Sequence, residues 1–160
     1  MRLRVLSIAG AVVVLAFGGV WHGGYAKSPP PPGATASSSP ARTAGTSLVT
    51  KMAGASETPP DKSLATGAAK ITVDASRNQV CWNLSVQKLQ GTVTGAAVQR
   101  APAGKAGPIV LHLSPLSGGS SQGCKKVGPP LARGIVKNPN AYYVNVHTSK
   151  YPDGEIRGQL

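Results

Sequence analysis

One short stretch constrains the fold of this chain more than any other, because apolar and polar side chains alternate along residues 79–86. Val80, Trp82, Leu84 and Val86 fall on one side of this alternation. Successive side chains of a β-strand point to opposite faces, so the run predicts a strand with one face in a core. Trp82 has the largest side chain of this region, and we expect it at the centre of that core.

Similar short runs recur between turn segments along the rest of the chain, at residues 47–52, 68–73, 92–98, 109–113, 141–148 and 155–160. The polar residues 74–78 between two of these runs predict a β-hairpin. Helical spacing is confined to the region of Leu131 and Ile135, and residues 117–123 have the Gly/Ser composition of a loop. We therefore expect an all-β fold, an antiparallel sandwich or barrel of about seven strands with one short helix.

The alternation also predicts which side chains face inward. From Ile109 to Leu113, the odd-numbered residues are expected to face the core. In the next run, the even-numbered residues from Tyr142 onward are expected in the core, and Asn145 and His147 lie on the opposite face.

The first part of the chain has the features of a targeting segment. Arg2 and Arg4 precede an uncharged apolar run over residues 5–20, and small residues before Lys27 offer a cleavage site. This run is shorter than the roughly 20 residues that span a bilayer. We expect residues 1–26 to be a signal peptide or, alternatively, an uncleaved N-terminal membrane anchor, with the rest of the chain outside the cytoplasm in either case.

A linker and a domain follow. Residues 27–45 are rich in Pro, Ser, Ala and Thr and have almost no large apolar side chain, so they predict a disordered linker. The composition changes at Thr46, and residues 46–160 are expected to form one domain in the cell envelope or outside the cell.

The chain has two cysteines, Cys81 and Cys124. In an exported protein such a pair favours a disulfide. Two free thiols and a two-cysteine metal site are the alternatives, although no nearby Cys or His has the spacing of a zinc site.

The formal net charge is +12, which can attract anionic polymers. The basic residues are scattered singly apart from Lys125 and Lys126. Nucleic-acid-binding proteins instead show a clustered basic patch, so we expect no nucleic-acid partner.

Five blocks of the sequence resemble the CHRD (chordin) domain family: MAGASETPP at 52–60, VCWNLSV at 80–86, AGKAGPIV at 103–110, NPNAYYVNVHT at 138–148 and PDGEIRGQL at 152–160. The resemblance covers residues 46–160 and is similar to the bacterial secreted type of the family. It implies an immunoglobulin-like β-sandwich with a loose similarity to copper/zinc superoxide dismutases. It implies no defined molecular function.

One departure from the family pattern bears on metal binding. Many members carry His-Ile-His where this chain has Ala97, Val98 and Gln99. Two imidazoles on one strand face can share a metal, and this chain has neither. A superoxide-dismutase-like copper site is therefore not expected.

The blocks contain the residues that we expect to matter most for the structure, namely Trp82, Tyr142, Asn145, His147, Gly154, Arg157 and Gly158. His147 is the weak candidate for a metal ligand, and its structural alternative is a strand histidine bonded to backbone. Arg157 is expected to anchor backbone carbonyls or a carboxylate, with Glu57 or Glu155 as its partner. The sequence shows no paired acid and base and no nucleophile motif, so no catalytic residue and no cofactor are expected.

The sequence therefore predicts an exported, non-catalytic binding or structural module whose envelope or extracellular partner is unknown. One alternative is a superoxide-dismutase-like metal-binding protein or enzyme. Another is an electrostatic binder of anionic envelope polymers.

Overall fold

The computed structural model describes residues 45–160. The predicted targeting segment 1–26 and all but the last residue of the predicted linker 27–45 lie outside the described residues. Within 45–160, no helix has the length and apolar character needed to cross a membrane.

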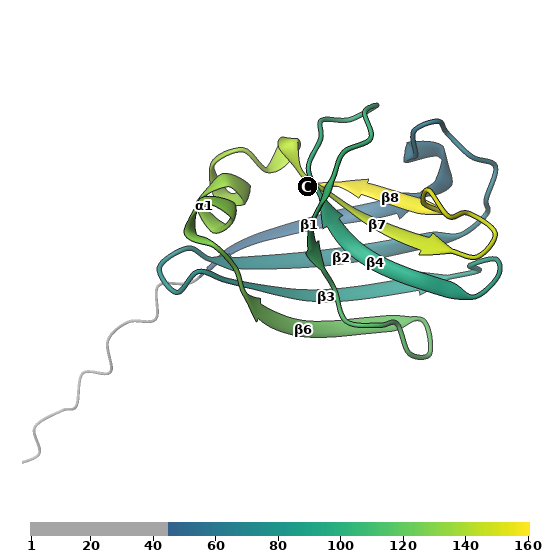
Figure 1. Ribbon diagram of the computed structural model, residues 1–160. Helices are drawn as coiled ribbons and strands as arrows, with labels where there is room; N and C mark the ends of the chain where they lie inside the picture. The colour runs from purple at the N-terminus through teal and green to yellow at the C-terminus, as the bar shows by residue number, and fades with distance from the viewer. Residues whose placement is uncertain (1–44) are drawn as a thin grey trace, which may run out of the picture. The chain divides into compact units, whose positions relative to one another are not determined.

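The described chain forms one antiparallel sheet of eight strands in the order β5-β4-β7-β8-β1-β2-β3-β6, and the all-β prediction is confirmed. The sheet curls so that its two halves enclose a core (Figure 1). The strands are β1 (Thr46–Ala53), β2 (Thr66–Asp74), β3 (Gln79–Gln87), β4 (Val93–Gln99), β5 (Ile109–His112), β6 (Ser120–Lys126), β7 (Tyr143–Thr148) and β8 (Ile156–Gln159).

The curled sheet has two four-stranded halves, which we call the first half (β1, β2, β3 and β6) and the second half (β4, β5, β7 and β8). Strands β1 and β8 join the halves through a single backbone pair, Ala53 with Arg157. Across the core, the Ile156 Cδ1 atom lies 3.1 Å from the place where a Cβ on Gly67 would stand. The absence of a side chain at Gly67 therefore lets the two halves approach closely here.

The core is built from small and branched aliphatic side chains. Strand β3 contributes Val80, Trp82, Leu84 and Val86, all buried as the alternation predicts. The Trp82 indole N–H donates to Ser121 Oγ on β6 over 3.1 Å, so the buried ring has its polar group satisfied.

The predicted hairpin connects β2 and β3. Asp74 Oδ1 accepts hydrogen bonds from the Ser76 hydroxyl at 2.6 Å and from the Arg77 backbone N–H at 2.9 Å. Asn78 closes the turn with φ of 51°, a left-handed conformation that Asn tolerates better than most residues. The turn residues therefore set the register of the longest strand pair.

Two expectations about the strands are wrong. Part of the predicted Gly/Ser loop 117–123 belongs to an eighth strand, β6, which pairs with β3. Ile109 is 42% exposed, although it was expected to face the core. The pairing of β4 with β5 shifts register between Val98 and Gln99, and this irregularity breaks the alternation on which the expectation depended.

The helix α1 (Pro129–Lys137) is longer than the one or two turns expected. It buries Ala132 and Ile135 and contacts β2 at one end of the sheet. Two short 3-10 turns, η1 (Gly54–Ser56) and η2 (Pro139–Ala141), complete the fold. Pro139 follows the last helical turn and prevents its continuation.

Candidate functional site

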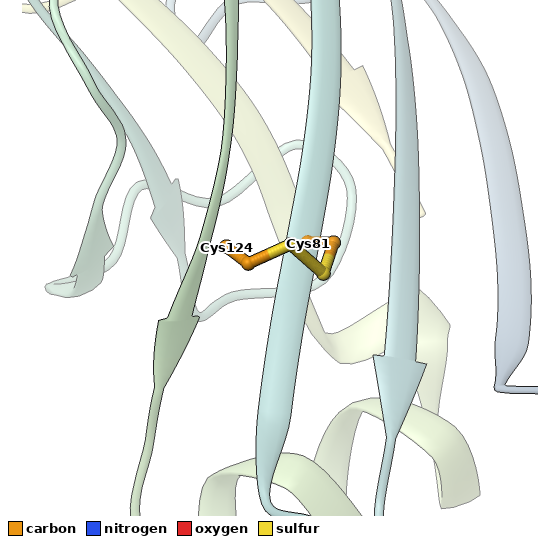
Figure 2. Close-up of a disulfide and its surroundings, with 2 residues drawn as sticks. All are labelled: Cys81 and Cys124. Atoms are coloured by element: carbon orange, nitrogen blue, oxygen red, sulfur yellow. A yellow bond between two sulfur atoms is a disulfide. The ribbon is translucent and has the colours of Figure 1, made fainter.

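The disulfide predicted between Cys81 and Cys124 is confirmed. The two residues are direct cross-strand partners on β3 and β6 (Figure 2). Cys124 is exposed and Cys81 is half-buried, so the bond lies on the outer face of the first half. It ties the edge strand β6 to the rest of the sheet and is compatible with an oxidising compartment.

The outer face of the second half, on which the alternation places Asn145 and His147, is covered by loops. Tyr143, Asn145 and Arg157 are directed away from the core, yet all three are buried. The segments that line the space above them are the loop after η1, the loop 100–108 and the loop 149–154. A pocket of about 300 Å³ lies there, lined by Glu57, Thr58, Gln99, Ala106, Gly107, Tyr143, Asn145, His147, Pro152, Asp153 and Arg157.

Arg157 forms one wall of this pocket and is 2% exposed. Its Nη1 donates to the carbonyl of Lys105 at 2.7 Å, and its Nη2 donates to the carbonyl of Pro102 at 2.9 Å and to Gln159 Oε1 at 3.0 Å. The guanidinium stacks on the ring of Tyr143, with its Cζ 3.4 Å from the ring centroid. Arg157 therefore holds the 100–108 loop over the sheet.

Of the two expected anchoring roles of Arg157, the structure shows hydrogen bonds to backbone carbonyls. Neither Glu57 nor Glu155, the two proposed partners, lies within ion-pair distance of the guanidinium. Tyr143 supports the same loop, because its hydroxyl oxygen accepts a hydrogen bond from the Gly107 N–H at 3.1 Å.

His147 lies at the pocket rim on β7, half-buried. Its Nδ1 is 2.9 Å from the Pro152 carbonyl, so this nitrogen carries the proton and donates it. Its Nε2 is 3.3 Å from Gln99 Nε2 and accepts from that amide. Both ring nitrogens therefore have a hydrogen-bond partner in the protein, and one of the partners is a backbone carbonyl, as expected for a strand histidine with a structural role.

The residues 45–160 contain no group of three or more His, Cys, Asp or Glu side chains placed to hold a metal ion. Gln99 stands where many members of the CHRD family, which the sequence resembles, have the second histidine of a His-Ile-His segment. Its side-chain amide faces His147. His112, the other histidine of the described chain, is exposed on β5 at the far side of β4.

Glu57 is a pocket residue that sequence reasoning considered only as a partner for Arg157. Its side chain is 7% exposed, and its Oε1 has no hydrogen-bond partner. Burial raises the pKa of Glu57 to about 7, against the opposing effect of the nearby Arg157 charge. The Oδ1 of Asn145, which is 2% exposed, also has no partner.

The turn before β8 packs closely against Asn145 and Glu57, and this is possible because residue 154 is a glycine. Gly154 has φ of +133°, and a Cβ on it would lie 2.6 Å from Asn145 Oδ1 and 2.8 Å from Glu57 Oε1. Gly154 is thus the point at which the Glu57 carboxyl and the Asn145 amide meet. Gly158, on β8, would place a Cβ 2.7 Å from the carbonyl of Lys51, so it permits the close β1–β8 seam.

The remaining predicted structural residues lie around the core. Tyr142 is buried immediately before β7, and its hydroxyl occupies the place that a Cβ on Gly134 in α1 would need. Trp82 belongs to the core and does not contribute to the pocket. The structure therefore brings Asn145, His147 and Arg157 to one site and leaves Trp82 and Tyr142 outside it.

A comparison with known protein families identifies the family to which the described domain belongs. The CHRD domain family model matches residues 48–160, which cover both halves of the sheet and every residue that lines the pocket. Searches of curated proteins and of solved structures give no match. The match spans more than half of the sequence, and the chain therefore belongs to the CHRD domain family.

Proposed function

We propose that this protein is an exported, non-catalytic binding module of the cell envelope or extracellular space, and that the pocket over β7 and β8 is its ligand site. The observation that carries the proposal is that two of the residues lining the pocket have a buried oxygen, Glu57 Oε1 and Asn145 Oδ1, without a hydrogen-bond partner. A buried polar group without a partner costs roughly 1–3 kcal/mol, and a ligand that supplies donors recovers it.

Export is supported by two independent features. The N-terminal residues have the charge and apolar length of a targeting segment. The domain holds an exposed disulfide, and such bonds persist in oxidising compartments.

A binding role is favoured over a catalytic one because the two basic side chains of the pocket, Arg157 and His147, are already engaged with the protein. Arg157 donates to backbone carbonyls, and His147 has a partner on each ring nitrogen. A general base or a metal ligand needs a lone pair that is available to the substrate or the metal. These side chains instead fix the loops that form the pocket walls.

A second candidate function, binding of anionic envelope polymers, is favoured by the charge of the first half. Its outer face exposes Lys51, Lys70 and Lys126, while four of the five carboxylates of the sequence, all but Asp74, lie near or beside the pocket. Binding of this kind must weaken steeply between low and physiological salt. Salt-insensitive binding to such a polymer would contradict it.

The main proposal is tested on the full chain by hydrogen–deuterium exchange with a panel of small polar envelope components, followed by product analysis. We expect slower exchange in the 100–108 and 149–154 loops with a bound component, and recovery of that component unchanged. Conversion of the component to a product would overturn the non-catalytic assignment.

A measurement of the metal content of the same protein distinguishes our proposal from the metal-binding alternative. Near-stoichiometric copper or zinc that is lost in His147→Ala and kept in the matched control His112→Ala would replace our proposal with a metal-dependent one. Because both nitrogens of His147 have protein partners, we expect no such difference between the two variants.

A further inference from the structure

Two buried carboxylates near the pocket differ in how the protein satisfies them. Glu155 is fully buried, and it accepts hydrogen bonds from the Ser63 hydroxyl at 2.7 Å, the Gln90 N–H at 2.8 Å and the Thr148 hydroxyl at 2.9 Å. Glu57 is almost as deeply buried, and its Oε1 has no partner. The fold thus supplies strong donors to both oxygens of Glu155 and leaves one oxygen of Glu57 without any.

The unpartnered atoms around Glu57 are all hydrogen-bond acceptors. Besides Glu57 Oε1 and Asn145 Oδ1, the buried Asp61 Oδ2 has no partner. The Glu57 carboxyl and the Asn145 amide meet beside Gly154, where a Cβ would lie 2.8 Å from Glu57 Oε1, 2.6 Å from Asn145 Oδ1 and 2.5 Å from Asn145 Nδ2. A ligand that satisfies this pair must therefore bring hydrogen-bond donors and, because the neighbourhood is rich in carboxylates, positive charge.

Resting on the binding function proposed above, we propose that the pocket recognises a protonated primary amine, whose N–H groups donate to Glu57 Oε1 and Asn145 Oδ1. An ammonium group offers three donors and no acceptor, which complements two acceptors side by side. The volume of about 300 Å³ is large enough for a lysine side chain or one amino sugar.

A bare metal ion fits this site less well. Only two side-chain oxygens converge beside Gly154, and no group of three His, Cys, Asp or Glu forms within residues 45–160. Divalent cations such as Ca²⁺ need six to eight oxygen ligands. A neutral alcohol fits the donor requirement with one O–H but leaves the Glu57 charge uncompensated.

Several charged groups set the conditions for binding. The charged or titratable groups near Glu57 are Arg157 on β8, Asp61 after η1, Asp153 in the 149–154 loop and His147 on β7. Lys150 lines the neighbouring pocket. The guanidinium of Arg157 opposes a cationic ligand, but its nitrogens are held by the 100–108 loop and by Gln159.

A proton competes with the amine for the same oxygens. In the empty pocket the Glu57 carboxyl, with its pKa raised to about 7 by burial, holds a proton in half of the molecules near neutral pH. The amine binds the carboxylate form, so its binding releases that proton. For an amine that stays protonated over this range, such as a lysine side chain, binding should therefore be about tenfold tighter at pH 8 than at pH 6, because the fraction of carboxylate rises by about that factor.

The test uses titration calorimetry of the full chain with two amines, Nα-acetyl-lysinamide and glucosamine. Their neutral counterparts, Nα-acetylnorleucinamide and N-acetylglucosamine, are the ligand controls. We expect each amine that fits to bind at least about tenfold more tightly than its counterpart. Preference for the lysine derivative would identify peptide side chains as the source of the amine, and preference for glucosamine would identify amino sugars.

Two variants make the test specific to the site. Glu57→Gln should lower the affinity at least about tenfold and abolish the pH dependence, since no carboxylate remains to exchange its proton. Asp74→Asn, which removes an exposed carboxylate at the β2–β3 turn, should change neither. If Glu57→Gln does not fold, NMR titration of the Glu57 carboxyl in the unmodified protein serves instead, and a saturating amine should lower its pKa.

The outcomes separate this inference from the binding function on which it rests. Equal binding of amines and neutral counterparts at the pocket, or an unchanged Glu57 titration in saturating amine, would overturn the amine assignment and leave the binding function standing. Failure of both amines to bind would also overturn it. Stoichiometric metal dependent on His147 would instead overturn the binding function itself.

Discussion

The two halves of the sheet use their outer faces in different ways. On the first half the outer face is exposed, and its strands show the simple alternation of buried and exposed residues along β2 and β3. On the second half both faces of β7 are buried, because loops from three parts of the chain cover the outer one. The exposed face needs a covalent bond at its edge, whereas the covered face is held by a buried arginine and carries the pocket.

Removal of the Arg157 side chain tests this comparison most severely. Arg157→Ala leaves the carbonyls of Lys105 and Pro102 without donors and takes away the charge beside Glu57. We expect the free energy of unfolding to fall by about 3–5 kcal/mol, as when a buried charged pair loses one member. Urea denaturation measures it.

Lys70→Ala is the matched control on the exposed face, where the side chain is in solvent. We expect a change within about 0.5 kcal/mol. Equal losses for the two variants would show that the covered face is no more important for stability than the exposed one.

Loss of the disulfide should affect the first half. The double variant Cys81→Ser/Cys124→Ser opens a loop with a sequence separation of 43. The chain-entropy model gives a loss of about 4 kcal/mol. Hydrogen exchange should show β6 opening before β7, and protection lost first in β7 would contradict the division of roles between the halves.

The pH dependence of stability reports on Glu57. The pKa of this carboxyl is raised from its ordinary value of 4.5 to about 7 in the folded protein, so the folded state binds a proton that the unfolded chain has released between these values. Its contribution to stability is complete below pH 4.5 and is lost as the pH rises through 7, a decrease of roughly 3 kcal/mol. Urea denaturation between pH 4 and 8 measures this slope.

Glu57→Gln should flatten the slope over that window, and Asp74→Asn should retain it. A slope that persists in Glu57→Gln would assign the titration to another group and remove Glu57 from the account of the pocket.

The smallest expected effect concerns the support of the 100–108 loop. Tyr143→Phe removes the acceptor of the Gly107 N–H and keeps the ring beneath Arg157. We expect a loss of about 1 kcal/mol. Asn83→Ala, on the exposed outer face of β3, should change the free energy of unfolding by less.

The first half of the sheet, whose outer face is exposed, was the part that could be predicted from the sequence. The alternation of Val80, Trp82, Leu84 and Val86 and the polar turn before them are local signals, and the disulfide followed from the expected compartment. The alternation along β7 was equally clear and placed Asn145 on the face opposite the core, but it did not indicate that this face is covered, because alternation reports the two faces of a strand and not what folds back over them.

The pocket escaped prediction for the same reason. It depends on Glu57, Asn145 and Gly154, which lie far apart in the sequence or form no spacing that indicates a site. Strand β6 was missed because it is mostly polar and has no run of alternating apolar residues, and its place in the sheet comes from pairing with β3.

The position of β8 in the sheet has a consequence for how the domain is made. Residues 156–159 form an interior strand that separates β7 from β1, so the hydrogen-bonded connection between the two halves cannot form before this segment has been synthesised. A chain that emerges with its N-terminal end first cannot close prematurely, because the piece that joins its halves arrives after all the other strands. If the chain is exported as we propose, late closure of this kind would leave the sheet open during translocation, and a truncation that removes only these residues would leave β7 and β1 without the strand that pairs with both.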